Sequence, residues 1–241
     1  MDPTGRVQIS PAALNNISQT NILCVRSHVG ETLNLQRQRN GYETEAANVS
    51  YDSRKAAGIL VFVGGAQFVL GMLIAEAIYP GYSISQNYIS DLGVGSAASV
   101  FNSSVFLLGL MVVGGAYFVH RIFRNRLVTT LLVLSGIGAM GVGIFPEDSP
   151  VMHEIVSDVA FIFGGLAPIA ACKLQKKPLN YLSIAMGLLS LCALILLSAQ
   201  YSFGLGEQCF LGLGPGGMER MIVYPILLWE TAFGGYLIGS S

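Results

Sequence analysis

Two short polar stretches interrupt a very apolar chain, and both hold residue types that can bind ligands or transfer protons. NYISDLGVG, at 87–95, contains Ser90 and Asp91, and FPEDSPVMHE, at 145–154, contains His153 and Glu154. A histidine beside carboxylates can act as a general base, and a serine beside such a base can act as a nucleophile. The candidate catalytic residues are therefore His153, Asp91, Ser90 and Glu154, although their spacing does not require an enzyme.

A second set of residues forms a candidate ligand site. Asp158 lies four residues after Glu154, on the same helical face, and it lies about two turns inside an apolar run, where lipid exposure is costly. We therefore expect Asp158 to face neighbouring helices. Arg220 lies apart from the other basic residues, and we expect it to pair with Asp91 or Asp158 or to contact a ligand directly. The candidate ligand-binding residues are Asp91, His153, Asp158, Arg220 and Tyr224, the last sharing a helical face with Arg220.

Glu230 lies about ten residues inside the last apolar run. A carboxyl group at membrane depth is by default a functional candidate. It is either a proton-carrying group or a protonated acid that joins two helices by hydrogen bonds. Gln67 and the polar cluster at 102–104 are candidate partners for it.

Six apolar runs position these residues. The chain has 241 residues, of which 52% are apolar and only 11% charged, whereas soluble domains carry about 25% charged residues. Runs of about 20 residues cross the roughly 30 Å hydrocarbon core of a membrane as helices. The predicted spans are about 57–79, 98–120, 127–145, 151–172, 180–200 and 220–239. We therefore predict an all-α polytopic membrane protein, with six transmembrane helices in a domain at 56–241.

Residues 1–55 differ from the rest of the chain, because they are polar and show no helical or strand period. Such a segment cannot bury enough apolar surface to offset its ordering entropy. We predict that it is largely disordered and cytoplasmic. Residues 1–30 have no compact apolar stretch, so we expect no cleavable signal peptide.

The basic residues predict the orientation. Apart from Arg220, the lysines and arginines lie in the amino-terminal segment, at 121–126 and at 173–177. Because positive charge is retained in the cytoplasm, the chain should be a multi-pass protein of the cell membrane with both termini inside. The acidic residues after residue 55 then gather on or near the outer face, except Glu230.

The sequence demands no cofactor and assigns no metal, and a metal site of His153 with Asp91, Glu154 or Asp158 stays open. The chain has three histidines, and His28 and His120 fall on the predicted cytoplasmic side, which excludes a multi-histidine zinc site. The stretch GLGPGGMER at 212–220 contains Gly-x-Gly-x-x-Gly but lacks the preceding strand that dinucleotide binding requires. It is either a connecting loop or a glycine-rich turn that binds an anion, such as a lipid phosphate, at a helix N-terminus.

Four stretches resemble the family designated domain of unknown function 998: YPGYSISQNYISDLGVG, the asparagine of FNSS, GVGIFPEDSPVMHEIVSDVAF and GMERMIVYPILLW. The resemblance covers about 57–239 and implies a membrane bundle with motif residues gathered on one face. Those residues are Ser90, Asp91, Gly93, Asn102, Pro146, Glu147, His153, Glu219 and Arg220. More distantly, ISDLG and a later histidine at the head of a run are similar to the GPI-anchor remodelling and autophagy-modulator membrane family, which implies lipid handling.

Three functions fit these residues. The first is binding or organising a lipid or small amphiphile, with Arg220 meeting an anionic head group. The second is a membrane-embedded lipid hydrolase or transferase that uses His153 with Asp91 or Glu154. The third is a small proton-linked transporter that uses Glu230. The expected partners are membrane lipids and a small amphiphilic ligand rather than nucleic acid, and a homo-oligomer stays open.

Overall fold

The computed structural model of the chain describes residues 39, 51–202 and 213–240. The chain divides into two compact units, Met1–Val49 and Ser50–Ser241. Most of the segment at 1–55 that is predicted to be disordered lies outside the described residues. The second unit holds every element discussed below.

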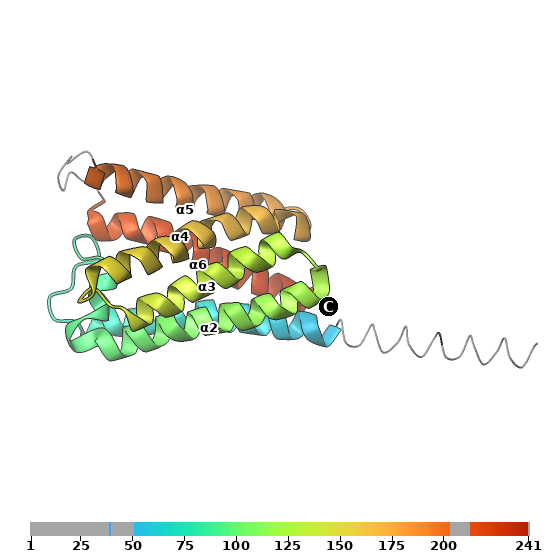
Figure 1. Ribbon diagram of the computed structural model, residues 1–241, viewed down its shortest axis with the longest axis horizontal. Coiled ribbons are helices and arrows are strands. Elements are labelled where there is room, and N and C mark those ends of the chain that lie inside the picture. Colours follow the sequence, from blue (N-terminus) through green and yellow to red (C-terminus); the bar gives the residue numbers. More distant parts are fainter. Residues whose placement is uncertain (1–38, 40–50, 203–212, 241) are drawn as a thin grey trace, which may run out of the picture. The chain divides into compact units, whose positions relative to one another are not determined.

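Six helices in the described residues are long and apolar enough to cross a membrane. They are the helix Tyr51–Ile78 (called the first helix), α2 (Ala98–Phe123), α3 (Arg126–Ile144), α4 (Pro150–Ala171), α5 (Leu179–Ser202) and α6 (Pro215–Gly239) (Figure 1). Three short 3-10 helices, η1 (Ser90–Gly93), η2 (Gly95–Ala97) and η3 (Cys172–Leu174), lie between them. The predicted all-α membrane architecture with six spans is confirmed.

The largest differences from the predicted boundaries lie at the starts of the first and last spans. The first helix begins at Tyr51 and α6 begins at Pro215, each earlier than predicted. Proline suits the first position of a helix, but Gly216 and Gly217 follow it, and glycine is a poor helix former. Tertiary contact explains the extension at α6. The Gly216 N–H donates to the Ser85 carbonyl oxygen at 3.0 Å.

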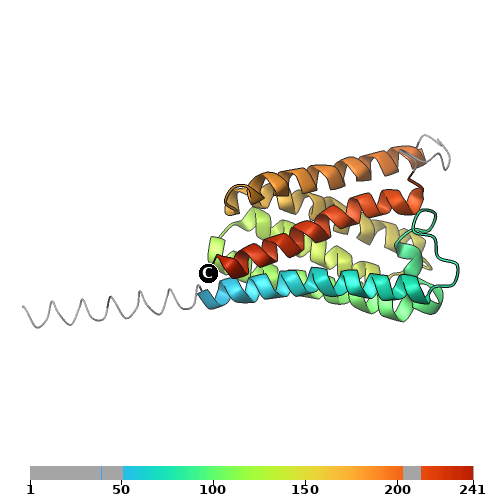
Figure 2. The ribbon, with the colours of Figure 1, turned by 180° about the vertical axis from the view of Figure 1, so that it is seen from behind.

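Consecutive helices pack side by side, and α6 returns to pack against the first helix (Figure 2). Small residues allow the backbones to approach closely, as is common in membrane bundles. A Cβ atom added to Gly109 of α2 would lie 2.3 Å from the Gly136 carbonyl oxygen of α3. A Cβ atom on Gly58 would lie 2.6 Å from the Gly234 carbonyl oxygen of α6. These contacts fix the helix positions that shape the interior.

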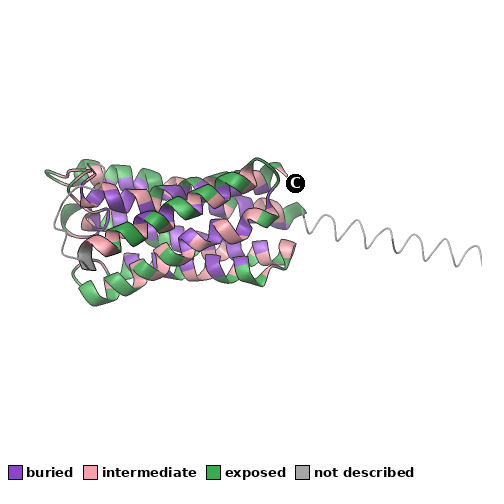
Figure 3. Ribbon diagram, turned by 90° about the horizontal axis from the view of Figure 1, so that it is seen from above, coloured by how far each residue is buried: buried purple, intermediate pink, exposed green. Residues whose placement is uncertain are grey.

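Buried residues line the inside of the bundle, and exposed residues cover its outside (Figure 3). Many of the exposed side chains are large and apolar, among them Leu70, Leu73, Leu127, Ile195 and Leu228. Large exposed apolar surfaces mark membrane or protein contacts rather than contact with water. The pattern agrees with a bundle surrounded by lipid.

A polar cluster joins α5, α6 and η3. Trp229 is 3% exposed, and its Nε1–H donates to Ser183 Oγ at 3.0 Å. The Ser183 hydroxyl lies 3.0 Å from Gln175 Oε1. On its other side the Trp229 ring stacks on Phe233, with ring centroids 5.1 Å apart. The indole is therefore held on two sides.

The two ends of the bundle differ in charge. The basic end, where α2 meets α3 and α4 meets α5, carries Arg54, Lys55, Arg121, Arg124, Arg126, Lys173, Lys176 and Lys177. The acidic end, where the first helix meets α2 and α3 meets α4, carries Glu76, Asp91, Glu147, Asp148, Glu154 and Glu219. Nearly all the candidate site residues lie at or near the acidic end.

Candidate functional site

Arg220 is buried at the start of α6, with 5% of its surface exposed. Its Nη2 lies 2.6 Å from Glu76 Oε1 of the first helix and donates to Tyr82 Oη at 2.7 Å. Its Nη1 donates to the carbonyl oxygens of Ile84 at 2.9 Å and Gly216 at 3.0 Å. Arg220 therefore fastens the loop at 79–97 to two helices.

The prediction that Arg220 pairs with Asp91 or Asp158 is wrong. Its carboxylate partner is Glu76, which the packing of α6 on the first helix brings into reach. Asp91 instead orders its own loop, where its Oδ2 accepts hydrogen bonds from Asn87 Nδ2 at 2.8 Å and from the Tyr88 N–H at 3.0 Å.

Tyr82 is the neutral partner of Arg220. Burial raises the pKa of Tyr82 to about 12, although the hydrogen bond from Arg220 opposes this shift. The phenol O–H donates to the Tyr88 carbonyl oxygen at 2.8 Å. The Arg220 guanidinium also lies 5.6 Å from the Tyr82 ring centroid, within the range of a cation–π contact.

The glycine-rich turn before α6 binds the same loop. The Gly214 N–H donates to Ser85 Oγ at 3.3 Å and the Gly216 N–H to the Ser85 carbonyl oxygen. A Cβ atom on Gly216 would lie 1.8 Å from the Asn87 carbonyl oxygen. These two donors hold the loop and are not presented to an anion, while Gly212 lies outside the described residues.

The first three turns of α4 present two different faces. The face with His153, Ser157 and Phe161 looks into the bundle and lines a cavity. Glu154 and Asp158 share the neighbouring face, and both are exposed. The expectation that Asp158 faces the interior is therefore wrong, because Ser157 occupies the inward position one residue earlier.

Ser90 and Glu147 meet at the acidic end. Ser90 Oγ donates to Glu147 Oε1 at 2.6 Å. Burial raises the pKa of Glu147 above its ordinary value, the Ser90 hydrogen bond lowers it in part, and the nearby Asp91 carboxyl raises it again. Glu147 therefore takes up a proton more readily than an exposed glutamate does.

A serine hydrolase requires a hydrogen bond between the nucleophilic serine and its base. None of the described hydrogen bonds joins Ser90 to His153. Ser90 donates to a carboxylate, and His153 Nδ1 lies 2.8 Å from the Phe145 carbonyl oxygen. None of the described hydrogen bonds joins His153 to Asp91 or Glu154. No group of three or more His, Cys, Asp or Glu residues in the described ranges is arranged to hold a metal ion.

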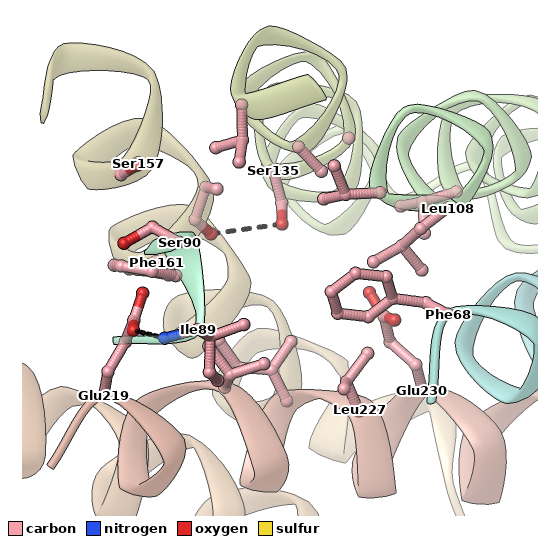
Figure 4. Close-up of a pocket in the computed structure, with 18 of the residues that line it drawn as sticks. Phe68, Ile89, Ser90, Leu108, Ser135, Ser157, Phe161, Glu219, Leu227 and Glu230 are labelled. Carbon is pink, nitrogen blue, oxygen red and sulfur yellow. Dashed lines mark hydrogen bonds between the residues drawn. The ribbon is translucent and has the colours of Figure 1, made fainter. Parts of the chain in front are cut away.

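A cavity of about 80 Å³ lies between the first helix, α2, α3, α4 and α6 (Figure 4). Its wall is mainly apolar and includes three phenylalanine rings, Phe68, Phe101 and Phe161. Its polar groups lie apart from one another. Ser90, His153, Ser157 and Glu219 line the part near the acidic end, and Glu230 lines the part deeper along α6.

Glu219 and Glu230 face this cavity from one side of α6 (Figure 4). Eleven residues make three helical turns, so the two lie on one face, roughly 16 Å apart along the axis. Glu219 is 6% exposed and its Oε2 accepts a hydrogen bond from the Ile89 N–H. Glu230 is 4% exposed, and its Oε2 has no hydrogen-bond partner among the described residues.

The candidate partners of Glu230 bind elsewhere. Gln67 Nε2 donates to the carbonyl oxygens of Gly64 and Ser104, at 3.1 and 2.9 Å, and so ties the first helix to α2. Asn102 Nδ2 donates to the Gly93 carbonyl oxygen at 2.9 Å. None of the described hydrogen bonds joins Gln67 or Asn102 to Glu230.

A comparison of the whole chain with protein families identifies its family. The model of one family, described as "Protein of unknown function (DUF998)", matches residues 62–236. The chain belongs to the DUF998 family. The match runs from the first helix to α6 and confirms the resemblance seen in the sequence. No curated protein and no solved structure matches the chain.

The DUF998 fold separates the predicted ligand residues into different places. His153 lines the cavity, together with the catalytic candidate Ser90 and the intramembrane Glu230. Tyr224 lines a second space, a groove of about 320 Å³ between the first helix and α6 that also holds Glu76. Asp91, Asp158 and Arg220 line neither space.

Glu219 is the cavity residue that our candidate ligand site omitted. The family resemblance includes it, and its spacing from Glu230 was also a signal, because eleven residues place two acids on one helical face. Its neighbour Arg220 drew attention as an isolated cation. In this DUF998 protein the Glu219 carboxyl faces the cavity, while the Arg220 guanidinium pairs with Glu76 outside it.

Proposed function

We propose that this DUF998 protein binds a small amphiphile inside the membrane, in the cavity between the first helix, α2, α3, α4 and α6. The observation that carries the proposal is the cavity itself, because an apolar wall separates one buried carboxyl near the acidic end from another deeper in the bundle. Ligand pockets are mainly apolar with a few well-placed polar groups. The residues proposed to contact the ligand are Ser90, His153, Glu219 and Glu230.

The polar groups of the cavity favour a ligand that donates hydrogen bonds. Two of them are carboxyls, which accept hydrogen bonds when ionised. Arg220, expected to meet an anionic head group, is already bound to Glu76 and to backbone carbonyl groups. An anionic ligand would therefore find no free arginine in the cavity, and its charge would oppose ionisation of the two carboxyls.

The size of the cavity limits the ligand. An apolar cavity of about 150 Å³ is enough to bind benzene in another protein, and this one measures about 80 Å³. It suits a short apolar group or a few water molecules rather than a whole lipid. A longer tail would leave the cavity toward the acidic end.

We also propose that both termini are cytoplasmic and that the acidic end faces outward in the cell membrane. The distribution of charge supports this orientation, because positive residues are retained on the cytoplasmic side. In the described part of the second unit, all the basic residues except Arg220 lie at the basic end. The ligand would then enter from the outer side.

The geometry favours binding over hydrolysis. A nucleophile needs an adjacent base, but Ser90 donates to Glu147 and His153 Nδ1 lies against a backbone carbonyl oxygen. The second nitrogen of His153 is left to contact a ligand. Replacing His153 by alanine should therefore reduce the affinity for the ligand, but some binding should remain.

Native mass spectrometry of the protein in nanodiscs tests the proposal. Ala139 lines the cavity and is 9% exposed, whereas Ile137 of the same helix is 49% exposed. Ala139→Leu should fill the cavity and release a bound small molecule, while Ile137→Leu should retain it. If the wild type and Ala139→Leu retain the same molecule in equal amount, with equal thermal stability, the cavity is not the binding site.

A further inference from the structure

We propose that the ligand is a cationic amine and that Glu230 binds its ammonium group in exchange for a proton. The inference rests on the proposed binding function and names the chemical class of the ligand. Its basis is the position of Glu230, which lines an apolar cavity, is 4% exposed and has an oxygen without a partner among the described residues.

A buried carboxyl without a partner restricts what can occupy the space beside it. An ionised carboxylate in apolar surroundings is very costly unless an opposite charge compensates it. A bound proton or the cation of a ligand removes that cost, and the two exclude each other. Glu230 is therefore suited to exchange one for the other.

No protein cation is placed to do this. In the described part of the chain, neither lysine nor arginine lines the cavity. Arg220, roughly 15 Å away along α6, is paired with Glu76. The other basic residues of the second unit lie at the basic end, so a cation at Glu230 has to come from outside the protein.

The other titratable groups lie near the acidic end of the cavity or outside it. Within the described lining they are His153 and Glu219, both near the acidic end. Glu76 of the first helix is neutralised by Arg220, while Glu154 and Asp158 of α4 are exposed. The α2 and α3 residues of the lining are uncharged. The surroundings thus favour a cation over an anion.

The wall of the cavity also suits a cation. Phe68, Phe101 and Phe161 line it, and aromatic faces attract ammonium groups, more strongly where water is excluded. The rest of the wall is mostly apolar and matches an alkyl chain. A short alkylamine with its nitrogen at Glu230 and its chain toward the acidic end satisfies both features.

The exchange is balanced in charge. Glu230 in its neutral form loses its proton to water at the acidic end, and the arriving ammonium ion forms an ion pair with the carboxylate. The O–H bond of the acid breaks and a new O–H bond forms to water, and no other covalent bond changes. One proton should therefore be released for each ammonium ion bound.

Calorimetric titration of the protein in nanodiscs with n-hexylamine tests the inference, with empty nanodiscs as the reference for partitioning. Repeating the titration in buffers of different ionisation enthalpy counts the protons released. We expect about one proton for each amine bound by the wild type, and none with n-hexanol, which is matched in shape but neutral. Glu230→Gln should lower amine affinity about tenfold or more, whereas Asp148→Asn, at an exposed position outside the cavity lining, should leave it unchanged.

The outcomes separate the two proposals. If n-hexylamine binds to the wild type without proton release, or binds equally to Glu230→Gln, the amine exchange is overturned. Binding that is still lost in Ala139→Leu would keep the cavity as the binding site in that case. If neither n-hexylamine nor n-hexanol binds above the reference and no small molecule co-purifies, both proposals fail.

Discussion

Glu219 and Arg220 are consecutive residues of α6, and they bind two different residues of one loop. Glu219 accepts a hydrogen bond from the Ile89 N–H, whereas Arg220 donates to the Ile84 carbonyl oxygen. Arg220 also binds Glu76 of the first helix. The loop at 79–97, which contributes Ser90 to the cavity, is therefore fixed by a single turn of α6.

Removing Arg220 should strongly destabilise the protein. Arg220→Ala leaves Glu76, whose side chain is 13% exposed, without its cation. Breaking a largely buried ion pair in this way typically costs about 3–5 kcal/mol in the free energy of unfolding. Arg121→Ala removes an exposed arginine at the basic end and serves as the control. Denaturant unfolding of both variants in detergent measures the difference. Equal stability of the two variants would show that the ion pair contributes nothing.

The stability of the acidic end should depend on pH through Glu147. Its folded-state pKa lies above the ordinary value of 4.5, so the folded protein binds more protons than the unfolded chain between these two values. The contribution of Glu147 to stability should therefore fall as the pH rises through this window.

Melting temperatures of the wild type and Glu147→Gln across this pH range measure the effect. Glu147→Gln cannot ionise and should show a flatter profile, whereas Asp148→Asn, at an exposed neighbouring position, should follow the wild type. A Glu147→Gln profile parallel to that of the wild type would contradict the expectation.

Two glycines of α6 should respond in opposite directions to the same substitution. A Cβ atom on Gly216 would lie 1.8 Å from the Asn87 carbonyl oxygen, whereas a Cβ atom on Gly235 would have no neighbour within 4 Å. Gly216→Ala should destabilise by about 1–3 kcal/mol through overpacking. Gly235→Ala should stabilise by up to about 1 kcal/mol through helix propensity. Unfolding measured side by side checks the sign of each change.

Labelling of single cysteines from outside the cell tests the orientation. In a variant without its four native cysteines, Asp148→Cys at the acidic end should react with a membrane-impermeant maleimide on intact cells. Lys176→Cys at the basic end should react only after the cells are opened. The reverse pattern would invert the proposed topology and place the cavity opening in the cytoplasm.

The helices were predictable because hydrophobic length alone identifies a membrane span. All six predicted spans match helices in the described residues. The start of α6 was less predictable, because Gly216 is a poor helix former and its N–H donates to the distant Ser85 carbonyl oxygen. A contact between residues so far apart in sequence leaves no trace in the local pattern.

The candidate site was only partly predictable, for a related reason. Arg220 drew attention because it is a basic residue far from the others in the sequence. Its partner, Glu76, depended on which helix end packs beside it. The inward face of α4 was missed by one residue, so Asp158 is exposed and Ser157 lines the cavity. A rotation of about 100° separates consecutive helical residues, and the apolar pattern of a membrane span does not fix that rotation because lipid and protein neighbours are both apolar.

Trp229 gives this protein a built-in optical reporter. It is the only tryptophan of the chain and precedes Glu230 directly. Its indole is held between Ser183 and Phe233 and is shielded from solvent, so its emission should be blue-shifted. A charge that appears or disappears at the next residue changes the electric field across the ring, so ligand exchange should be readable as a spectral shift without any added dye.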